Sequence, residues 1–487
     1  MTGSDVFFWV VAALVTIDFG VRIVAIIVVP RNRRPTSGMA WLLAILFIPY
    51  VGILAFLLIG NTNLPRARRE KQAEISRVIR ESADGTERVS QQQSWPPWFE
   101  SVVLLNRNLG ATPLVGENNA ELIGNYHESL TAMTREIGRA RAFVHVEFYI
   151  LVFDTTTAPF FDALEAAIGR GVTVRVLLDH VAWLKAKGHH RTLRILEKIG
   201  VQWQFTLPVQ PLKGKYQRFD LRNHRKLLIV DGGVGFMGSQ NIIDRSYNKR
   251  RNRQRGLRWH DLMARFDGPV VAGLNTIFIT DWYTETGELL SCGPKATTSA
   301  PRSGSLDCQV VPSGPGFESE NNLRLFLTLL YCAREKIIIS SPYFVPDEAM
   351  LYAITSATQR GIAVELFVSE IGDQAFVYHA QRSYYEALLR AGVTIWMYRA
   401  PDILHAKHFT IDDDVAVIGS SNMDMRSFSL NMEVSLMVCG ASFVRQMREV
   451  EAGYRSRSRQ LTLDEWMRQP LRSTILDNLA RLTSGLQ

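Results

Sequence analysis

Two long apolar runs lie near the start of the chain. Residues 6–29 contain only two charged side chains, Asp18 and Arg22, and residues 39–60 contain none. Each run is long enough to cross a hydrocarbon layer of about 30 Å as a helix. Asp18 and Arg22 lie four positions apart on one helical face, where they could neutralise each other. No basic region precedes the first run, which disfavours a cleaved signal peptide. We therefore expect residues 1–64 to form a transmembrane helical hairpin rather than two buried helices of a soluble core.

Basic residues flank both sides of the second apolar run, and this complicates the topology. The loop before that run contains Arg31, Arg33 and Arg34, and the segment after it contains Arg66, Arg68, Arg69 and Lys71. The positive-inside rule favours a cytoplasmic position for both segments, which two full spans cannot provide. Either one segment is re-entrant or shallow, or the loop is an exception to the rule.

The rest of the chain consists of two similar halves. Polar segments rich in Gly, Pro, Ser and Thr predict a connector at 65–99 and a linker at 285–316, which leave a first half at 100–284 and a second at 317–455. Each half begins with an apolar strand, AFVHVEFYI in the first and KIIISSPYFV in the second, followed by a helical stretch and a further strand. This alternation predicts a duplicated α/β domain with two mixed or mainly parallel sheets flanked by helices.

The final segment, residues 456–487, has apolar side chains at helical spacing: Leu471, Ile475, Leu476, Leu479 and Leu482. Most helices of this kind dock on their own protein, but an interfacial helix with Trp466 and nearby arginines at the lipid headgroups is the alternative.

Composition narrows the class of partner. The formal net charge of +8 favours an anionic partner, either nucleic acid or acidic lipid. A basic run, DRSYNKRRNRQRGLRWH at 244–260, is by default a solvated loop, although it could also contact an anionic lipid surface or nucleic acid. The four cysteines have no CxxC spacing, which argues against a metal site or a disulfide framework.

The most specific feature is a motif that occurs once in each half. Residues 223–241 read NHRKLLIVDGGVGFMGSQN and residues 404–422 read LHAKHFTIDDDVAVIGSSN. Both fit His-x-Lys, four residues, Asp, six residues and Gly-Ser-x-Asn. The candidates for catalysis are His224, Lys226, Asp231, His405, Lys407 and Asp412, and the supporting candidates are Ser239, Asn241, Ser420 and Asn422. Because strand residues alternate, each histidine should share a face with its lysine.

These residue types suit displacement at a phosphodiester. That reaction needs a nucleophile, an acid for the departing oxygen, and positive charge around the phosphoryl oxygens. Histidine can fill either of the first two roles near neutral pH, lysine supplies a cation, and Ser and Asn add hydrogen-bond donors. Two motifs that meet across a pseudo-twofold axis supply the whole set, so we expect no metal or cofactor. Asp231 and Asp412 have a second interpretation, in which they only shape the turn after the strand.

The paired motifs resemble those of the phospholipase D superfamily over roughly residues 100–450, and the N-terminal hairpin resembles that of the bacterial cardiolipin synthases. The resemblance implies a covalent phosphohistidine and transfer of a phosphatidyl group between glycerol headgroups. It also implies an acidic residue downstream of each motif in contact with the opposite histidine, for which Glu433 and Asp261 are the candidates. It implies phosphatidylglycerol and anionic membrane lipid as partners and no nucleic acid, with a multi-pass location in the bacterial inner membrane and the catalytic domain on the cytoplasmic side.

Three alternatives stay open. A different donor or acceptor, such as phosphatidylethanolamine, or plain hydrolysis as a phospholipase D would use the same site. A phosphodiesterase acting on nucleic acid is disfavoured by the membrane hairpin. A non-catalytic scaffold is disfavoured because neither motif is broken. The sequence leaves the oligomeric state and the identity of the attacking histidine undecided.

Overall fold

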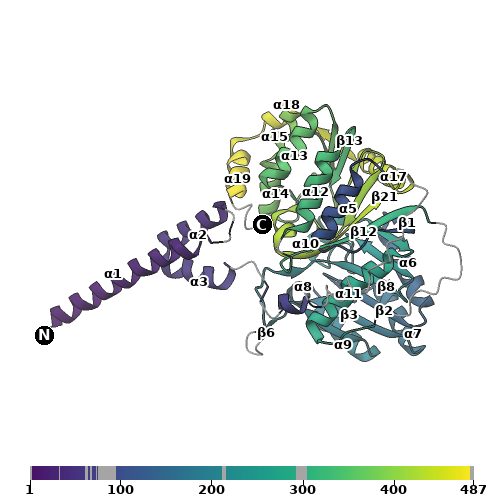
Figure 1. Ribbon diagram of the computed structural model, residues 1–487, viewed down its shortest axis with the longest axis horizontal. Helices are drawn as coiled ribbons and strands as arrows, with labels where there is room; N and C mark the ends of the chain where they lie inside the picture. Colours follow the sequence, from purple (N-terminus) through teal and green to yellow (C-terminus); the bar gives the residue numbers. More distant parts are fainter. Residues whose placement is uncertain are drawn as a thin grey trace. The chain divides into compact units, whose positions relative to one another are not determined.

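The computed structural model describes residues 3–31, 33, 35–60, 64–65, 68–72, 74, 95–210, 215–291, 304–317 and 319–482. The chain divides into two compact units, Met1–Asn63 and Leu64–Gln487 (Figure 1). The two halves expected from the sequence therefore belong to one compact unit.

The first unit contains one helix that can span a membrane. In α1 (Gly3–Val28), residues Asp5–Val28 have a mean hydropathy of 2.3, and almost all of their side chains are exposed in the structure. At 1.5 Å per residue the helix exceeds the ~30 Å of a hydrocarbon core. Arg22 donates to Asp18 Oδ2 at 2.7 Å and to the carbonyl oxygen of Leu46 at 3.1 Å, so the two charges expected to neutralise each other do so.

The second apolar run is not the single helix that we expected over 39–60. It forms α2 (Pro35–Phe47) and α3 (Pro49–Ile59), because Pro49 has no N–H to donate and its ring is incompatible with a continuous helix. At 1.5 Å per residue, α2 is about 20 Å long and α3 about 17 Å, both too short to cross a bilayer.

The two short helices fold back on each other. A Cβ atom on Gly52 would lie 2.6 Å from the carbonyl oxygen of Ala44, so only glycine permits this close approach. The rings of Trp41 and Phe56 meet edge to face at 5.5 Å. Arg33, just before α2, donates to the carbonyl oxygen of Gly60, just after α3. The start of α2 and the end of α3 therefore lie close together.

The second unit is built on one continuous sheet. Its strand order is β4-β3-β2-β8-β9-β11-β1-β12-β21-β19-β18-β13-β15-β16-β22. The first-half strands are β1 (Val115–Ile123), β2 (Phe143–Phe148), β3 (Thr173–Asp179), β4 (Gln202–Thr206), β8 (Lys226–Val230), β9 (Val234–Gly238) and β11 (Met263–Asp267). The second-half strands are β12 (Leu306–Ser313), β13 (Lys336–Ser340), β15 (Ala363–Ser369), β16 (Thr394–Tyr398), β18 (His408–Ile411), β19 (Val415–Gly419), β21 (Asn431–Cys439) and β22 (Ser458–Leu461).

This sheet is of the expected mixed type, but it is one sheet where we expected two. It is mixed: β2, β3 and β4 are parallel, as are β13, β15 and β16, whereas the strands between these two groups are antiparallel. Part of the expected linker at 285–316 is also a strand. β12 pairs with β1 on one side and β21 on the other, and so joins the sheets of the two halves into one.

Helices cover both faces of this sheet, which explains why strands such as β8 and β19 are buried throughout. In the first half they are α5 (Phe99–Asn108), α6 (Tyr126–Arg139), α7 (Ala158–Gly169), α8 (His180–Lys185), α9 (His189–Ile199), α10 (Arg250–Gln254) and α11 (Val270–Thr286). In the second half they are α12 (Asn321–Cys332), α13 (Glu348–Gln359), α14 (Ala375–Arg382), α15 (Tyr385–Ala391), α16 (Met425–Ser429), α17 (Ala441–Ser456), α18 (Leu463–Met467) and α19 (Leu471–Leu482).

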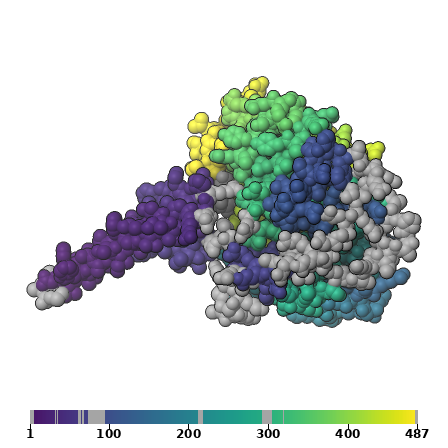
Figure 2. Space-filling view, in the orientation of Figure 1, coloured from purple at the N-terminus to yellow at the C-terminus, as the bar shows by residue number. Residues whose placement is uncertain are grey.

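The helices define three apolar cores. Side chains of α11 and α17 share one core with the sheet strands of both halves. On the other face, α6 and α7 cover the first half, and α12 and α13 cover the second. Figure 2 shows α5, in blue, at the surface beside the green helices of the second half, where it packs against α12. The halves are therefore joined by a shared core as well as by β12.

Seven short strands complete the description: β5 (Val209–Gln210), β6 (Lys215–Tyr216), β7 (Arg222–Asn223), β10 (Arg258–His260), β14 (Phe344–Val345), β17 (Asp402–Leu404) and β20 (Met423–Asp424). Three of them take part in two parallel pairs across the halves, β7 with β21 and β10 with β17. Both pairs lie immediately before a motif histidine.

Candidate active site

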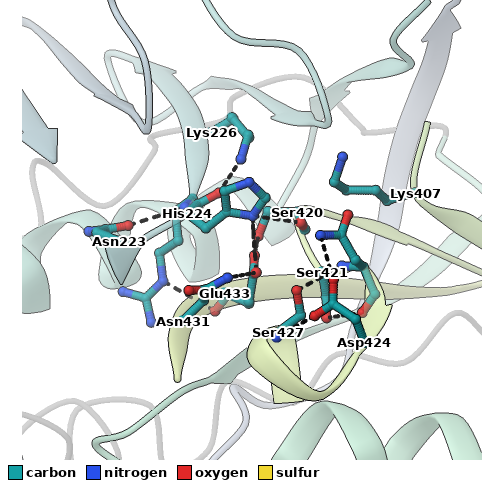
Figure 3. Close-up of polar contacts among 12 residues, drawn as sticks. Asn223, His224, Lys226, Lys407, Ser420, Ser421, Asp424, Ser427, Asn431 and Glu433 are labelled. Atoms are coloured by element: carbon teal, nitrogen blue, oxygen red, sulfur yellow. Dashed lines mark hydrogen bonds and ion pairs between the residues drawn. The ribbon is translucent and has the colours of Figure 1, made fainter. Parts of the chain in front are cut away.

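The β7–β21 pair places the first histidine beside an acid of the second half. Asn223 lies opposite Met432, and the next residues on the two strands are His224 and Glu433. The backbone N–H of His224 donates to the carbonyl oxygen of Met432 at 2.9 Å. Nδ1 of His224 lies 3.0 Å from Glu433 Oε1, 3.1 Å from Oε2, and 3.1 Å from the carbonyl oxygen of Ser420 (Figure 3).

The β10–β17 pair repeats this arrangement with the halves exchanged. His260 lies opposite Leu404, and the next residues are Asp261 and His405. The backbone N–H of His405 donates to the carbonyl oxygen of His260 at 2.7 Å, and Nδ1 of His405 lies 2.6 Å from Asp261 Oδ1. Both contacts between a histidine and the opposite acid are those that the family resemblance implied.

The partners of Nδ1 fix the tautomer of each histidine. An ionised carboxylate and a carbonyl oxygen only accept hydrogen bonds, so Nδ1 of His224 and Nδ1 of His405 must each carry the proton. The other ring nitrogen, Nε2, then carries a lone pair. Each histidine is therefore oriented by a carboxylate with Nε2 left for chemistry, the pairing used wherever a carboxylate orients a catalytic imidazole.

The two motif lysines bring positive charge to the same space. Lys226 donates to the carbonyl oxygen of His224 and lies 5.3 Å above the ring of Tyr149. Lys407 lies 2.9 Å from the carbonyl oxygen of His405 and 3.1 Å from its Nε2. Lys407 also lowers the pKa of His224, and Lys226 that of His405, so the lysines act across the halves as well as within them.

Burial dominates the electrostatics of the site. It lowers the pKa of His224 to about 4 against the opposing charge of Glu433, and it lowers the pKa of His405 as well. Burial also lowers the pKa of Lys407 to about 8. Burial raises the pKa of Asp261, but the interaction with His405 outweighs it and the pKa falls to about 2. Without substrate, the site therefore holds neutral histidines and ionised carboxylates near neutral pH.

The glycine and serine of each Gly-Ser-x-Asn sequence help to position the carboxylates of Asp261 and Glu433. A Cβ atom on Gly238 would lie 2.3 Å from the carbonyl oxygen of Leu262, and one on Gly419 would lie 2.3 Å from that of Val434, so each chain passes tightly against the neighbouring strand. The serine that follows each glycine donates to a carboxylate, Ser239 to Asp261 and Ser420 to Glu433. The Oγ of each serine also accepts the backbone N–H of the residue after that acid.

This placement of the serines differs from the expected one. We expected Ser239 and Ser420 to donate to a phosphoryl oxygen. Ser239 Oγ instead donates to Asp261 at 2.7 Å, and Ser420 donates to Glu433. Each serine thus fixes the acid that orients the opposite histidine.

The motif asparagines are also engaged within their own halves. Asn241 donates to the hydroxyl of Tyr247 at 2.9 Å and accepts the backbone N–H of Ile150 at 3.2 Å. Asn422 donates to Asp424 Oδ2 at 3.0 Å. Both amide groups therefore stabilise the loops around the site. We had expected them to donate to a phosphate group.

The motif aspartates lie at the opposite ends of the motif strands from the histidines. Asp231 follows β8, with φ of 52°, and accepts three backbone N–H groups at 2.8–2.9 Å, those of Arg141, Ala142 and Phe143. Asp412 follows β18, with φ of 49°, and accepts those of Arg334, Glu335 and Lys336. Their contacts match the second interpretation given above, in which they shape the turn.

Aromatic side chains near the histidines were not singled out from the sequence. The ring of Tyr149 meets that of His224 edge to face, with 4.8 Å between the ring centres. The rings of Tyr343 and His405 have a similar orientation, with 6.4 Å between their centres. The available signal was a tyrosine near the end of the opening strand of each half. These rings help to exclude water from the two imidazoles.

A buried polar network supports the first motif and was also missed. Asn223 donates to Glu147 at 2.6 Å, Arg225 contacts Asp281, and the backbone N–H of Asn223 donates to Asp179 at 2.9 Å. The residues corresponding to Asn223 and Arg225 in the second motif are Leu404 and Ala406. The network is therefore specific to the first half, and only the sequence difference between the two motifs could have pointed to it.

No group of three or more His, Cys, Asp or Glu side chains in the described part of the chain is arranged to hold a metal ion. The chemical groups that the histidines, the motif lysines and the orienting acids bring to the site are two imidazoles, two lysine amino groups and two carboxylates.

Comparison with known proteins gives a consistent result over nearly the full length. The family described as "Cardiolipin synthase, PLD-like domain" matches residues 133–282 and 326–451, and the family "Phospholipase_D-nuclease N-terminal" matches residues 20–61. A protein named cardiolipin synthase A from Pectobacterium carotovorum is 32% identical over 99% of both chains. One of the same name from Proteus mirabilis is 30% identical over 99% of this chain and 97% of its own.

Among solved structures, the phosphatidylserine synthase of Haemophilus influenzae has a similar fold. The match has a TM-score of 0.59 and 16% sequence identity, and it covers 79% of this chain and 99% of that one. This likeness concerns the fold alone.

Proposed function

The chain belongs to the cardiolipin synthases of the phospholipase D type, a family of membrane phosphatidyltransferases, and on that premise we propose that it joins two phosphatidylglycerol molecules into cardiolipin and releases glycerol. The observation that carries the proposal is the cross-half pairing of each histidine with an acid of the other half, beside two buried lysines. A site of this composition suits a phosphodiester anion that is both attacked and protonated.

The reaction proceeds by two displacements. In the first, Nε2 of one histidine attacks phosphorus, an N–P bond forms, and the P–O bond to glycerol breaks as the other histidine gives its proton to the departing oxygen. In the second, that histidine takes the proton of an incoming glycerol hydroxyl, whose oxygen forms a new P–O bond as the N–P bond breaks. Lys226 and Lys407 offset the phosphoryl charge throughout.

We assign His224 as the nucleophile and His405 as the general acid. Among the described residues none hydrogen-bonds Nε2 of His224, whereas Lys407 lies 3.1 Å from Nε2 of His405. The His224 side chain is also the more accessible, 12% exposed against 6% for His405. A free and accessible lone pair favours attack.

The general acid must be protonated when substrate is bound. Burial and Lys407 lower the pKa of His405 in the empty site. A phosphodiester anion adds negative charge beside both lysines and so raises that pKa again. Substrate binding thus supplies the condition under which His405 can hold the proton that it later gives to glycerol.

The broken second segment supports a membrane topology with one full span. With α1 as the spanning helix and α2–α3 as a re-entrant pair, both basic segments lie on one face of the membrane, as the positive-inside rule requires. That face is the cytoplasmic side of the bacterial inner membrane, and the catalytic unit lies there. Of the alternatives that the sequence leaves open, this is the one in which the second segment is re-entrant.

Cysteine labelling tests this topology. The variants Val6→Cys, Thr36→Cys and Pro65→Cys mark the N-terminal end of α1, the start of α2 and the segment after α3. In intact cells with a permeable outer membrane, an impermeant maleimide should label position 6 above the wild-type background, and positions 36 and 65 only after lysis. Labelling of positions 36 and 65 from opposite sides would contradict the re-entrant arrangement.

Lipid analysis tests the reaction. The purified protein in detergent should convert phosphatidylglycerol labelled in its headgroup into cardiolipin and free glycerol in equal amounts, with or without EDTA. Phosphatidic acid as the main product would indicate a phospholipase D. Product that forms only when phosphatidylethanolamine is added would indicate a different donor or acceptor.

A further inference from the structure

The C-terminal helix α19 docks on the protein through its polar face. Asp477 is only 2% exposed, and its carboxylate contacts Nδ1 of His379 at 2.6 Å and Nε of Arg382 at 3.2 Å. Arg382 also donates to Ser473 Oγ at 3.2 Å. Both partners of Asp477 lie on α14. The helix is therefore held by an ion-pair network and not by its leucines.

The apolar face of α19 points away from the protein. At 100° per residue, five apolar side chains fall within an arc of about 140°, roughly opposite Asp477. All five are more than half exposed, and Leu471 and Leu482 reach 79% and 83%: the set is Leu471, Ile475, Leu476, Leu479 and Leu482. A helix that buries its acid and exposes its leucines is the reverse of an ordinary surface helix. Figure 2 shows α19 in yellow at the surface of the second unit.

Apolar side chains are also exposed on α14, which packs against α19, and on α18, which precedes α19 in the chain. Phe376 on α14 is 71% exposed, and Met467 on α18 is also exposed. The residues just before α14 lie near His405. Asp373 and Gln374 both hydrogen-bond the hydroxyl of Tyr343, and the ring of Tyr343 lies next to that of His405. The helix on which α19 docks, α14, therefore begins at the rim of the site.

We propose that α19 is an interfacial helix, which inserts its leucine face into the bilayer that contains the substrate and so holds the rim of the second half against the lipid surface. The occupant is an anionic lipid surface because exposed arginines accompany the apolar face: Arg468 precedes the helix, and Arg472 lies between Leu471 and Ile475 on the same side of α19. The enzyme's family also acts on membrane lipid. A second copy of the chain would meet the same arginines with like charge.

Photocrosslinking of the full-length protein tests the proposal without reference to turnover. Leu479 is replaced by photoreactive benzoylphenylalanine, and the variant is reconstituted in vesicles of phosphatidylglycerol and phosphatidylcholine with radiolabelled acyl chains. A matched variant carries the same group at Leu104, which is 56% exposed on α5. Irradiation should attach labelled lipid at position 479 at least ten times more efficiently than at position 104. A protein–protein adduct at position 479, or equal lipid labelling at both positions, would overturn the proposal.

A kinetic experiment gives an independent readout. The double variant Ile475→Gln, Leu479→Gln should raise the KM for phosphatidylglycerol, expressed as its mole fraction in the vesicle, by about tenfold with little change in kcat. Leu104→Gln should change neither. Since both glutamines are exposed, the unfolding temperature should be unchanged. An unaltered KM in the double variant would contradict the proposal, even if cardiolipin proves not to be the product.

Discussion

At the scale of single residues, the site consists of two interlocked chains of hydrogen bonds. Ser239 holds Asp261, which orients His405, and Ser420 holds Glu433, which orients His224. The repeated His-x-Lys pattern was sufficient to find the histidines. It could not show that the serines act on the acids, because these contacts depend on how β9 and β19 approach β11 and β21.

Removing the charge of an orienting acid should impair turnover without unfolding the protein. Glu433→Gln keeps the size of the side chain but loses the negative charge that fixes Nδ1–H of His224 and stabilises a positive imidazole. We expect kcat to fall by about 10²–10⁴-fold with the protein still folded. Glu386→Gln, at an exposed position of α15, is the matched control and should retain full activity. A Glu433→Gln enzyme with wild-type kcat would refute the orienting role.

The motif aspartates should respond in the opposite way. Asp231 and Asp412 each accept three backbone N–H groups in a left-handed conformation that asparagine also tolerates. Asp231→Asn or Asp412→Asn loses charge-assisted hydrogen bonds and should cost about 1–3 kcal/mol of stability. Thermal unfolding should show the loss, whereas kcat per folded molecule should stay within a few fold. A hundredfold fall in kcat with an unchanged unfolding temperature would instead indicate a catalytic role.

At the scale of elements, the sequence predicted whether a segment is a helix or a strand better than it predicted where that helix or strand begins and ends. The opening strands β2 and β13 and the strands β3 and β15 lie where the apolar runs placed them. β12 was hidden because the Gly-, Pro- and Ser-rich residues around it suggested a linker. The break between α2 and α3 was visible in principle, since Pro49 lies in the middle of the run, but the absence of charges favoured one long helix.

The fold-back of α2 and α3 depends on Gly52. A methyl group there would collide with the backbone at Ala44, whereas a methyl group on Gly20 of α1 would have no other atom within 4 Å. Gly52→Ala should therefore destabilise the first unit by about 1–3 kcal/mol, and Gly20→Ala should be neutral or slightly stabilising. The half-life of activity in detergent at raised temperature measures both. Equal half-lives for the two variants would argue against close packing of α2 on α3.

At the scale of the whole molecule, duplication makes one site from two half-sites in a single chain. The shared core, the β12 bridge and the two short parallel pairs fix the halves together, so that residues of one half meet those of the other across a long separation in the sequence. The repeat was readable from the sequence, but the register that pairs His260 with Leu404 was not, because it arises only when the halves are packed together.

Mixing inactive variants tests whether the site lies within one chain. Equal amounts of His224→Ala and His405→Ala protein should show no more activity than the two proteins measured separately, because neither chain has a complete site and the halves of a folded chain do not separate. Cardiolipin synthesis at a quarter or more of the wild-type rate in the mixture would mean that sites form between copies.

The most direct test of the two-histidine account is to trap the covalent intermediate. A phosphatidyl ester of nitrophenol needs little acid assistance to leave, so His405→Ala should react with it once and then stall for lack of the base of the second step. Mass spectrometry of peptides kept at alkaline pH should locate the phosphatidyl group on His224, and His224→Ala should carry none. An adduct on His405 in the His224→Ala protein would reverse the assigned roles. The absence of any phosphohistidine in either variant and in the wild type would contradict the mechanism itself.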